Sequence, residues 1–237
     1  MAYKQFQLDP ETEVTVYKRR TSRHLRLTVG ANGEIKVSIP TWAAYGVGVQ
    51  FARSRLNWIK QQQKPRTLLS EGLAIGKAHH LHFVPSQSAS RPASRLLGSN
   101  ILVTYPFELD ITDAAVQKAA ERGCLRALKE QAEALLPQRL QNLAQNHGFS
   151  YRSVGVKQLK SRWGSCDHQQ NINLNIFLMQ LPWELIDYVL IHELVHTRVL
   201  KHGPDFWSEF EAVWPNAKRL RRRLREHQPV LQSISAV

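Results

Sequence analysis

The stretch that most constrains the fold is residues 191–196, Ile-His-Glu-Leu-Val-His. His192 and His196 are four residues apart, so on a helix they project about 40° apart and both imidazoles can reach one metal ion. Glu193 points away from that pair, at a place where it can act on a water held by the metal. We therefore predict a helix that begins at Pro182, with proline in its first turn, and carries this motif.

A catalytic zinc ion needs three protein ligands and an open position for water. We expect His202 to be the third ligand. If the helix simply continued, His202 would lie about 9 Å beyond His196 along the axis, whereas a zinc–nitrogen bond is about 2.1 Å. The helix is therefore predicted to end between Thr197 and Lys201, and the chain to turn back near Gly203-Pro204. Three acidic residues are alternative ligands: Asp205, Glu209 and Glu211.

The motif predicts a hydrolase. Zinc lowers the pKa of its bound water, Glu193 accepts the proton, and the hydroxide attacks a carbonyl carbon before Glu193 protonates the leaving amine. Arg162 could hold a substrate carboxylate, a phosphate or the oxyanion. The same metal could instead hydrolyse a phosphoanhydride, as in a nucleotide pyrophosphatase, although the sequence has no Gly-rich phosphate cradle. A thiol enzyme using Cys166 is a less favoured alternative.

The composition is strongly basic, with 32 Lys and Arg against 19 Asp and Glu and a formal net charge of +13. Such a surface attracts polyanions non-specifically. Arg19, Arg20, Arg23 and Arg26 fall on predicted strands, and a basic run from Lys218 to Arg225 falls on a predicted helix. A nucleic acid or nucleotide partner, for example DNA docked on that helix, is therefore one hypothesis, and solvated charged faces are the other.

The cysteines and the apolar runs indicate the compartment. Cys124 and Cys166 cannot form a disulfide framework, and neither lies in a Cys-x-x-Cys pair. No run of about 18 apolar residues occurs, and the first residues lack an apolar secretion segment. We expect a cytoplasmic protein that does not enter a membrane, and the sequence does not predict its oligomeric state.

The first half of the chain has the pattern of a β-rich region. Apolar residues alternate between residues 14 and 39 around an Ala31-Asn32-Gly33 turn, which predicts a hairpin in a small antiparallel sheet. A helix is predicted over residues 47–62. Further strands are predicted over residues 73–84 and 101–105, with an exposed loop or long hairpin tip at residues 86–100.

The second half changes to a helical pattern. We expect Thr112 to cap a long helix from Asp113 to about Leu136, which Pro137 restarts or kinks. Strands follow over residues 153–159 and 172–178, and two helices follow the metal-binding motif, over residues 205–213 and 215–226. The strand at residues 171–178 could be a sheet edge that pairs with an extended peptide substrate, or an internal strand.

The change from β to α pattern at residues 106–112 suggests a domain boundary there. The predicted fold class is α+β. It comprises an N-terminal antiparallel β-rich domain with one helix, residues 1–108, and a mainly helical, zincin-like hydrolase domain with a small antiparallel sheet, residues 109–237.

Several short motifs occur together along the chain. In the second half they are Trp163-Gly164-Ser165-Cys166, Asn171-Ile172-Asn173-Leu174-Asn175, Pro182, Ile186-Asp187-Tyr188-Val189, the motif His192 to His196, His202, and Phe206-Trp207; in the first half they are Arg23, Val37, Pro40 and Trp58-Ile59. This combination resembles the YgjP-like zinc metallopeptidases, which are related to the SprT and WLM groups. The likeness extends from about Val14 to Arg225.

The resemblance implies a zincin-like catalytic domain with one zinc ion per chain. The ion would be bound by His192, His196 and His202, Glu193 would be the base, and the substrate would be a peptide or protein. Two stretches depart from the family pattern: residues 167–170, Asp-His-Gln-Gln, replace a small Ser/Gly-rich turn, and Lys201-His202-Gly203 replaces an Asn-His-Ser string. The relation to SprT also suggests a protease that acts on DNA-bound proteins.

Overall fold

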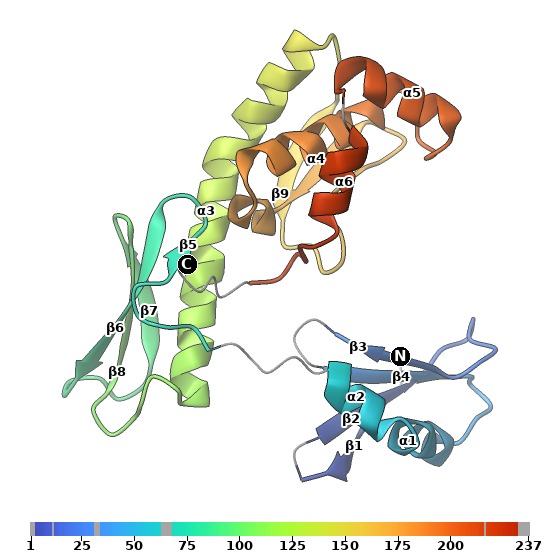
Figure 1. Ribbon diagram of the computed structural model, residues 1–237. Coiled ribbons are helices and arrows are strands. Elements are labelled where there is room, and N and C mark those ends of the chain that lie inside the picture. The colour runs from blue at the N-terminus through green and yellow to red at the C-terminus, as the bar shows by residue number, and fades with distance from the viewer. Residues whose placement is uncertain (1–2, 11, 31–33, 63–67, 216, 232–237) are drawn as a thin grey trace. The chain divides into compact units, whose positions relative to one another are not determined.

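The computed structural model describes residues 3–10, 12–30, 34–62, 68–215 and 217–231 (Figure 1). The chain divides into two compact units, Met1–Thr67 and Leu68–Val237. Each unit has its own cluster of buried apolar side chains.

The first unit is a four-stranded sheet covered by two short helices. Its strands are β1 (Tyr3–Asp9), β2 (Thr12–Lys18), β3 (Arg26–Val29) and β4 (Ile35–Ile39), in the order β1-β2-β4-β3, and its helices are α1 (Tyr45–Arg53) and α2 (Leu56–Gln62). The core combines inward strand residues such as Val14 and Val37 with Ala52 and Ile59 from the helices. Gly48 lets α1 approach the sheet closely, because a Cβ there would lie 2.6 Å from Val16.

The structure differs from the sequence prediction in three details of this unit. Strand β1 was not predicted, and the single helix expected over residues 47–62 is two helices. β2 and β4 are parallel, so the sheet is mixed rather than antiparallel. β3 and β4 form the expected antiparallel pair, while the Ala31-Asn32-Gly33 turn between them lies outside the described residues.

The second unit begins with another four-stranded sheet that packs on one long helix. Its strands are β5 (Ala74–Ile75), β6 (His79–Ser86), β7 (Ala93–Leu97) and β8 (Asn100–Pro106), in the order β5-β6-β8-β7. The sheet lies along the first half of α3 (Ala114–Asn146), as Figure 1 shows. β7 lies in the segment expected to be a loop or hairpin tip, and β6 and β8 are parallel.

This packing corrects the expected domain boundary at residues 106–112. Buried residues of the sheet, such as Leu81, Ile101 and Val103, share one core with Val116 and Leu128 of α3. The β-to-α change in the sequence therefore marks a change of element within one unit, because the apolar face of the sheet is buried by the helix that follows it. The boundary lies at residues 67–68.

Helix α3 is continuous over 33 residues and includes Pro137, where the sequence suggested a restart or kink. Its N-cap is Asp113, whose side chain makes no capping hydrogen bond. Thr112 does not cap the helix, because its hydroxyl donates to Asp110 Oδ1 at 2.8 Å.

The second half of α3 packs against a small sheet, the 3-10 helix that follows this sheet and the first helix after it (Figure 1). The sheet comprises β9 (Ser153–Lys157), β10 (Gly164–Cys166) and β11 (Asn171–Asn175), in the order β10-β11-β9. A 3-10 helix η1 (Ile176–Gln180) follows, then α4 (Trp183–Val195), α5 (Pro204–Val213) and α6 (Ala217–Leu224).

Two expectations for this sheet, the end of its last strand and its antiparallel pairing, are wrong. Of the two alternatives for that strand, a sheet edge or an internal strand, the structure shows the internal strand. The strand predicted to reach Leu178 ends at Asn175, because the Asn175 side chain accepts a hydrogen bond from Phe177 N and starts the 3-10 helix. β11 lies between β10 and β9 and pairs with both, so its backbone groups are not free for an added peptide strand. The β11–β9 pair is parallel, so this sheet is also mixed.

The α+β class is confirmed, with a β-rich first part, a long helix and small sheets. Within the described part of the chain, no helix combines the length and apolar character needed to cross a membrane.

Candidate metal centre

Helix α4 is held firmly in the core of the second unit. Apolar residues on several sides are fully buried, among them Leu185, Ile186 and Leu190. Asp187 of α4 forms a bidentate pair with Arg139 of α3, with Arg139 Nη2 at 2.7 Å from Asp187 Oδ2. This pair fixes α4 against α3, so the Asp187 carboxylate is engaged with Arg139 and not with the histidines.

Helix α4 ends before His202, as the sequence required. Its last residue is Val195 and its C-cap is His196, slightly before the predicted interval. Backbone hydrogen bonds from Arg198 and Val199 to Val195 O close a final turn, and Pro204 then starts α5 as its first residue. Because the chain reverses between these helices, His202 returns to the end of α4.

The three predicted ligands meet at one point. His202 Nε2 lies 2.9 Å from His192 Nε2 and 3.1 Å from His196 Nε2, and the ligand nitrogens of all three residues lie within 4.8 Å of one another. Two nitrogens bound tetrahedrally to zinc are about 3.4 Å apart, from bonds of about 2.1 Å. The observed spacing is close to this value.

Protonation of the three imidazoles also suits a metal ion. His196 Nδ1 lies 3.0 Å from Val199 O; as the proton donor in that bond it leaves the Nε2 lone pair directed at the cluster. Burial, helped by His196 and His202, lowers the pKa of His192 to about 3, which keeps that ring neutral. A single proton on His202 Nε2 could form a hydrogen bond to the Nε2 atom of either His192 or His196, but not to both. A metal cation can accept the Nε2 lone pairs of all three histidines at once.

One aromatic residue, Phe206, packs against the rings of all three histidines. The fully buried ring of Phe206 lies 4.9, 4.6 and 4.8 Å from the rings of His192, His196 and His202, centroid to centroid. Trp207 stacks on His202 at 6.2 Å. Phe206 and Trp207, which belong to the motifs shared with the family, lie in the first turn of α5. From there they pack against His202, the ligand that α4 cannot supply.

Glu193 is buried beside the histidines and is 4% exposed. Burial raises the pKa of Glu193 to about 8, and Arg162 opposes that shift. Gly164 of β10 packs directly on this side chain, since a Cβ at Gly164 would lie 2.7 Å from Glu193 Oε1. The carboxylate is therefore held between α4 and β10.

Arg162 lies on a loop that one buried amide holds in place. Asn175, 0% exposed, donates from Nδ2 to Leu159 O at 2.8 Å and to Arg162 O at 2.7 Å. The exposed Arg162 side chain lines the same cleft as the histidines and Glu193. The structure thus brings every predicted site residue together, while Asp205, Glu209 and Glu211 lie outside the histidine cluster.

The cleft has a volume of about 680 Å³ and is lined by residues that sequence analysis did not assign to the site. Arg221 and Arg225 line it from α6 and its end, and Tyr188 lines it from α4, one turn before His192. Burial raises the pKa of the Tyr188 hydroxyl. The four-residue spacing between Tyr188 and His192, and between Arg221 and Arg225, is the signal that could have placed them on the cleft side of their helices.

The basic helix α6 is partly neutralised. Arg219 and Arg223 both pair with Glu184 in the first turn of α4, with Arg219 Nη2 at 3.1 Å, and the guanidinium of Arg221 lies 4.6 Å from the ring of Trp207. Arg219 and Arg223 therefore hold α6 against α4, while Arg221 and Arg225 line the cleft. This weakens the hypothesis that the whole basic run docks on DNA.

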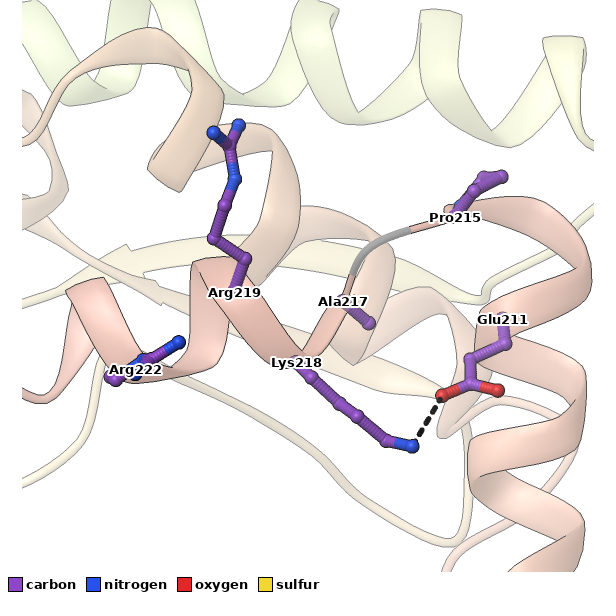
Figure 2. A pocket seen from close by; sticks show the side chains of 6 residues that line it. All are labelled: Glu211, Pro215, Ala217, Lys218, Arg219 and Arg222. Atoms are coloured by element: carbon purple, nitrogen blue, oxygen red, sulfur yellow. Dashed lines mark ion pairs between the residues drawn. The ribbon is translucent and has the colours of Figure 1, made fainter.

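A second hollow of about 580 Å³ is lined by residues of α5, of α6 and of the segment between them (Figure 2). Figure 2 shows Lys218 extending toward Glu211, with their charged atoms 3.9 Å apart, while Arg219 points away from Glu211. Of the candidate ligands named from the sequence, the alternative Glu211 lines this hollow, and none of the three histidines does.

Cys166 does not fit a nucleophile. Burial, together with the charges of Glu193 and Asp167, raises the pKa of its thiol to about 11, so the thiolate is scarce at neutral pH. No histidine hydrogen bond to its sulfur is seen among the described residues, where the thiol donates to Asp167 O at 3.5 Å.

Three convergent imidazoles beside a buried carboxylate, in a cleft open to solvent, define the class of metal-dependent hydrolases. The chain belongs to the YgjP-like family: the model of the YgjP-like metallopeptidase domain matches residues 23–227. It is thus a metallopeptidase, and the resemblance found in the sequence is confirmed.

Two solved structures show partial similarity to the chain. One is the metallopeptidase zymogen abylysin from Pyrococcus abyssi, with 26% identity and a TM-score of 0.35 over 39% of this chain and 94% of that chain. The other is the metallopeptidase zymogen jannalysin from Methanocaldococcus jannaschii, with 17% identity and a TM-score of 0.34 over 37% and 90%. No match was found among curated proteins.

Proposed function

We propose that this metallopeptidase depends on zinc, with one ion per chain held by His192, His196 and His202. The observation that carries the proposal is the convergence of three Nε2 atoms, with His202 Nε2 at 2.9 and 3.1 Å from the other two. Three neutral imidazoles and one open position are the donor set of catalytic zinc.

Glu193 is the proposed general base. A bound zinc ion would supply Lewis-acid chemistry at a peptide carbonyl and would favour ionisation of water. The Glu193 carboxylate takes the water proton and later delivers it to the leaving amine. Two opposing effects act on the pKa of Glu193. Burial raises it, which favours the protonated form that follows proton uptake from water. Arg162 lowers it, and a bound cation would act in the same direction and favour the carboxylate.

The arginines of the cleft are proposed to bind the substrate. Arg162, Arg221 and Arg225 line it from two sides, and the described lining includes one carboxylate, that of Glu193. Guanidinium groups bind carboxylates through paired hydrogen bonds. We therefore expect peptides with acidic side chains, or a free C-terminal carboxylate, to be preferred over basic peptides.

Metal content tests the ligand set. We expect about one zinc per chain in wild type by elemental analysis and loss of most of it in His202→Ala. His168→Ala removes an exposed histidine near the β10–β11 turn and should keep the metal. Full occupancy in His202→Ala would exclude His202 as the third ligand.

Hydrolysis of a peptide panel tests the base. Glu193→Gln keeps the side-chain shape and should lower kcat by about 10²- to 10⁴-fold while the zinc content stays unchanged. Unchanged activity in this variant would exclude the proposed role of Glu193.

The same arginines favour a second candidate function, hydrolysis of a nucleotide phosphoanhydride by the same metal centre. Arginine is suited to phosphate as well as to carboxylate. A nucleoside triphosphate panel, assayed with the same wild type and Glu193→Gln, separates the two functions. Glu193-dependent release of phosphate without peptide cleavage would favour the second.

A further inference from the structure

The first compact unit carries most of the excess positive charge of the protein. Residues 1–67 contain twelve Lys and Arg against four Asp and Glu, a formal net charge of +8 out of +13. The sequence has no acidic residue between Glu13 and Glu34, nor between Glu34 and Glu71. These positive charges can form a binding site only if they lie together on the small sheet.

The strand register separates the charges to opposite ends of the sheet. β2 and β4 are parallel, and Lys18 lies opposite Ile39 where both strands end. β3 runs the other way and begins at the same end, with Arg26 opposite Ser38. The acidic residues that flank or belong to described strands lie at the other end, near the β1–β2 turn and the start of β4: Asp9, Glu13 and Glu34.

The loop from β2 to β3 concentrates the basic side chains at one end. We call this surface the basic end; it comprises Lys18, Arg19, Arg20, Arg23, His24, Arg26 and Trp42. All four arginines are exposed, and among the described residues none of them makes an ion pair. Hydrogen bonds from Arg19 N to Ile39 O, 2.9 Å, and from Ser22 N to Arg19 O, 3.1 Å, fold this loop against the end of β4.

An exposed indole lies beside this loop. Trp42 is 83% exposed, and its neighbour Thr41 accepts a hydrogen bond from Lys18 Nζ at 2.9 Å. The ammonium groups of Lys4 and Lys18 each lie 5.3 Å from the ring of Tyr45. Exposing a large aromatic side chain to water has a free-energy cost. Proteins that bind single-stranded nucleic acid combine aromatic rings, on which bases stack, with positive charge along the backbone.

We propose that the basic end binds single-stranded nucleic acid, with the arginines on phosphates and Trp42 stacked on a base. Four exposed guanidiniums on one short loop and the start of β3 suit several phosphates of a nucleic acid rather than a single carboxylate. A single strand offers an unpaired base face to Trp42, whereas the bases of a duplex are stacked on one another. This site lies in the unit that does not contain the histidine cluster, so it does not depend on the proposed metal chemistry.

Fluorescence anisotropy of the full chain tests the proposal. The probe is a labelled single-stranded DNA of about 15 nucleotides, compared with its duplex. We expect the Arg20→Gln/Arg23→Gln variant to bind the single strand about tenfold more weakly, with the slope of log K against log salt smaller by about 1.4, since a single-strand phosphate contact contributes about 0.7.

A matched control separates a local site from overall charge. Lys218→Gln/Arg222→Gln removes two exposed charges from α6 and leaves the basic end unchanged, so we expect it to bind like wild type. Equal weakening by both pairs of substitutions, or loss only in the α6 variant, would overturn the proposal.

Trp42 provides the second arm. Trp42→Leu should weaken single-strand binding about fivefold or more, and Trp42→Phe, which keeps a ring, should recover part of the loss. All substituted side chains are exposed, and thermal unfolding is expected to match wild type. Unchanged binding by Trp42→Leu, or duplex binding as tight as single-strand binding, would overturn the assignment to a single strand.

Discussion

Gly164 of β10 lies against the Glu193 side chain, and a Cβ at Gly164 would be 2.7, 2.8 and 2.9 Å from Glu193 Oε1, Cγ and Cδ. Real Cβ atoms do not approach this closely, and Glu193 is almost fully buried. The carboxylate of the proposed base therefore has its position because residue 164 has no side chain.

The Gly164→Ala variant should displace that carboxylate. We expect kcat/KM for a peptide that wild type cleaves to fall about 10²-fold, because a misplacement of about 1 Å is costly at a reacting centre. Zinc content should be retained, since the three heavy atoms nearest to a Cβ at residue 164 all belong to Glu193 and not to the histidines. The control is Gly155→Ala on β9, where the nearest atom to a Cβ, Asn173 Oδ1, is at 3.4 Å. Full activity in Gly164→Ala would contradict this account.

Replacing Asn175 should loosen the loop that carries Arg162. The Asn175→Ala variant leaves Leu159 O and Arg162 O without their amide donor, and we expect it to lower the free energy of unfolding by about 1–3 kcal/mol. KM should rise more than kcat falls, because Arg162 is proposed to bind substrate. Urea unfolding and steady-state kinetics measure both, with Asn142→Ala, an exposed amide on α3, as control. A change no larger than the control's would refute the role.

A buried amide also joins the β5–β6 hairpin to α3. Gln131 Nε2 donates to Ile75 O at 3.0 Å and lies 2.7 Å from His79 Nδ1, and Lys77 N donates to Gln131 Oε1 at 2.5 Å. Gly76, with φ of 68°, leaves room for this side chain.

The Gln131→Ala variant should lower the free energy of unfolding by about 2–4 kcal/mol, because three partners lose their bonds in a buried place. Urea unfolding measures it, and Gln138→Ala on the exposed side of α3 should change stability by about 0.5 kcal/mol or less. Similar midpoints for the two variants would show that the network contributes little.

Cys166 should be dispensable for catalysis. Cys166→Ala should keep kcat/KM within about threefold of wild type, since a thiol whose pKa is raised cannot supply a thiolate at neutral pH. Because the pKa of the Cys166 thiol is raised to about 11, the thiol is protonated at neutral pH. The rate of alkylation by iodoacetamide should therefore be low at neutral pH and should increase as the pH approaches 11. Rapid alkylation at neutral pH, accompanied by loss of activity, would instead support a mechanism in which the Cys166 thiolate is the nucleophile.

Local patterns determined much of the fold and of the site. The four-residue spacing of His192 and His196 placed both on one face of a helix. In a continued helix, His202 would lie six residues, or about 9 Å, beyond His196. The chain therefore had to turn before His202 for this residue to reach the same metal ion. Alternation found most strands, since side chains of a strand point to opposite faces. These inferences depend on neighbours in sequence, and the structure agrees with them.

Tertiary packing decided the rest. The sequence showed where β pattern changes to α, but only the burial of β5–β8 on α3 shows that both belong to one unit. Period-two patterns do not specify a partner strand, so neither the parallel β2–β4 pair nor the central place of β11 could be read from them. The contacts of Gly164 with Glu193 and of Arg221 with Trp207 join residues far apart in sequence, and such distances are fixed only when the core closes.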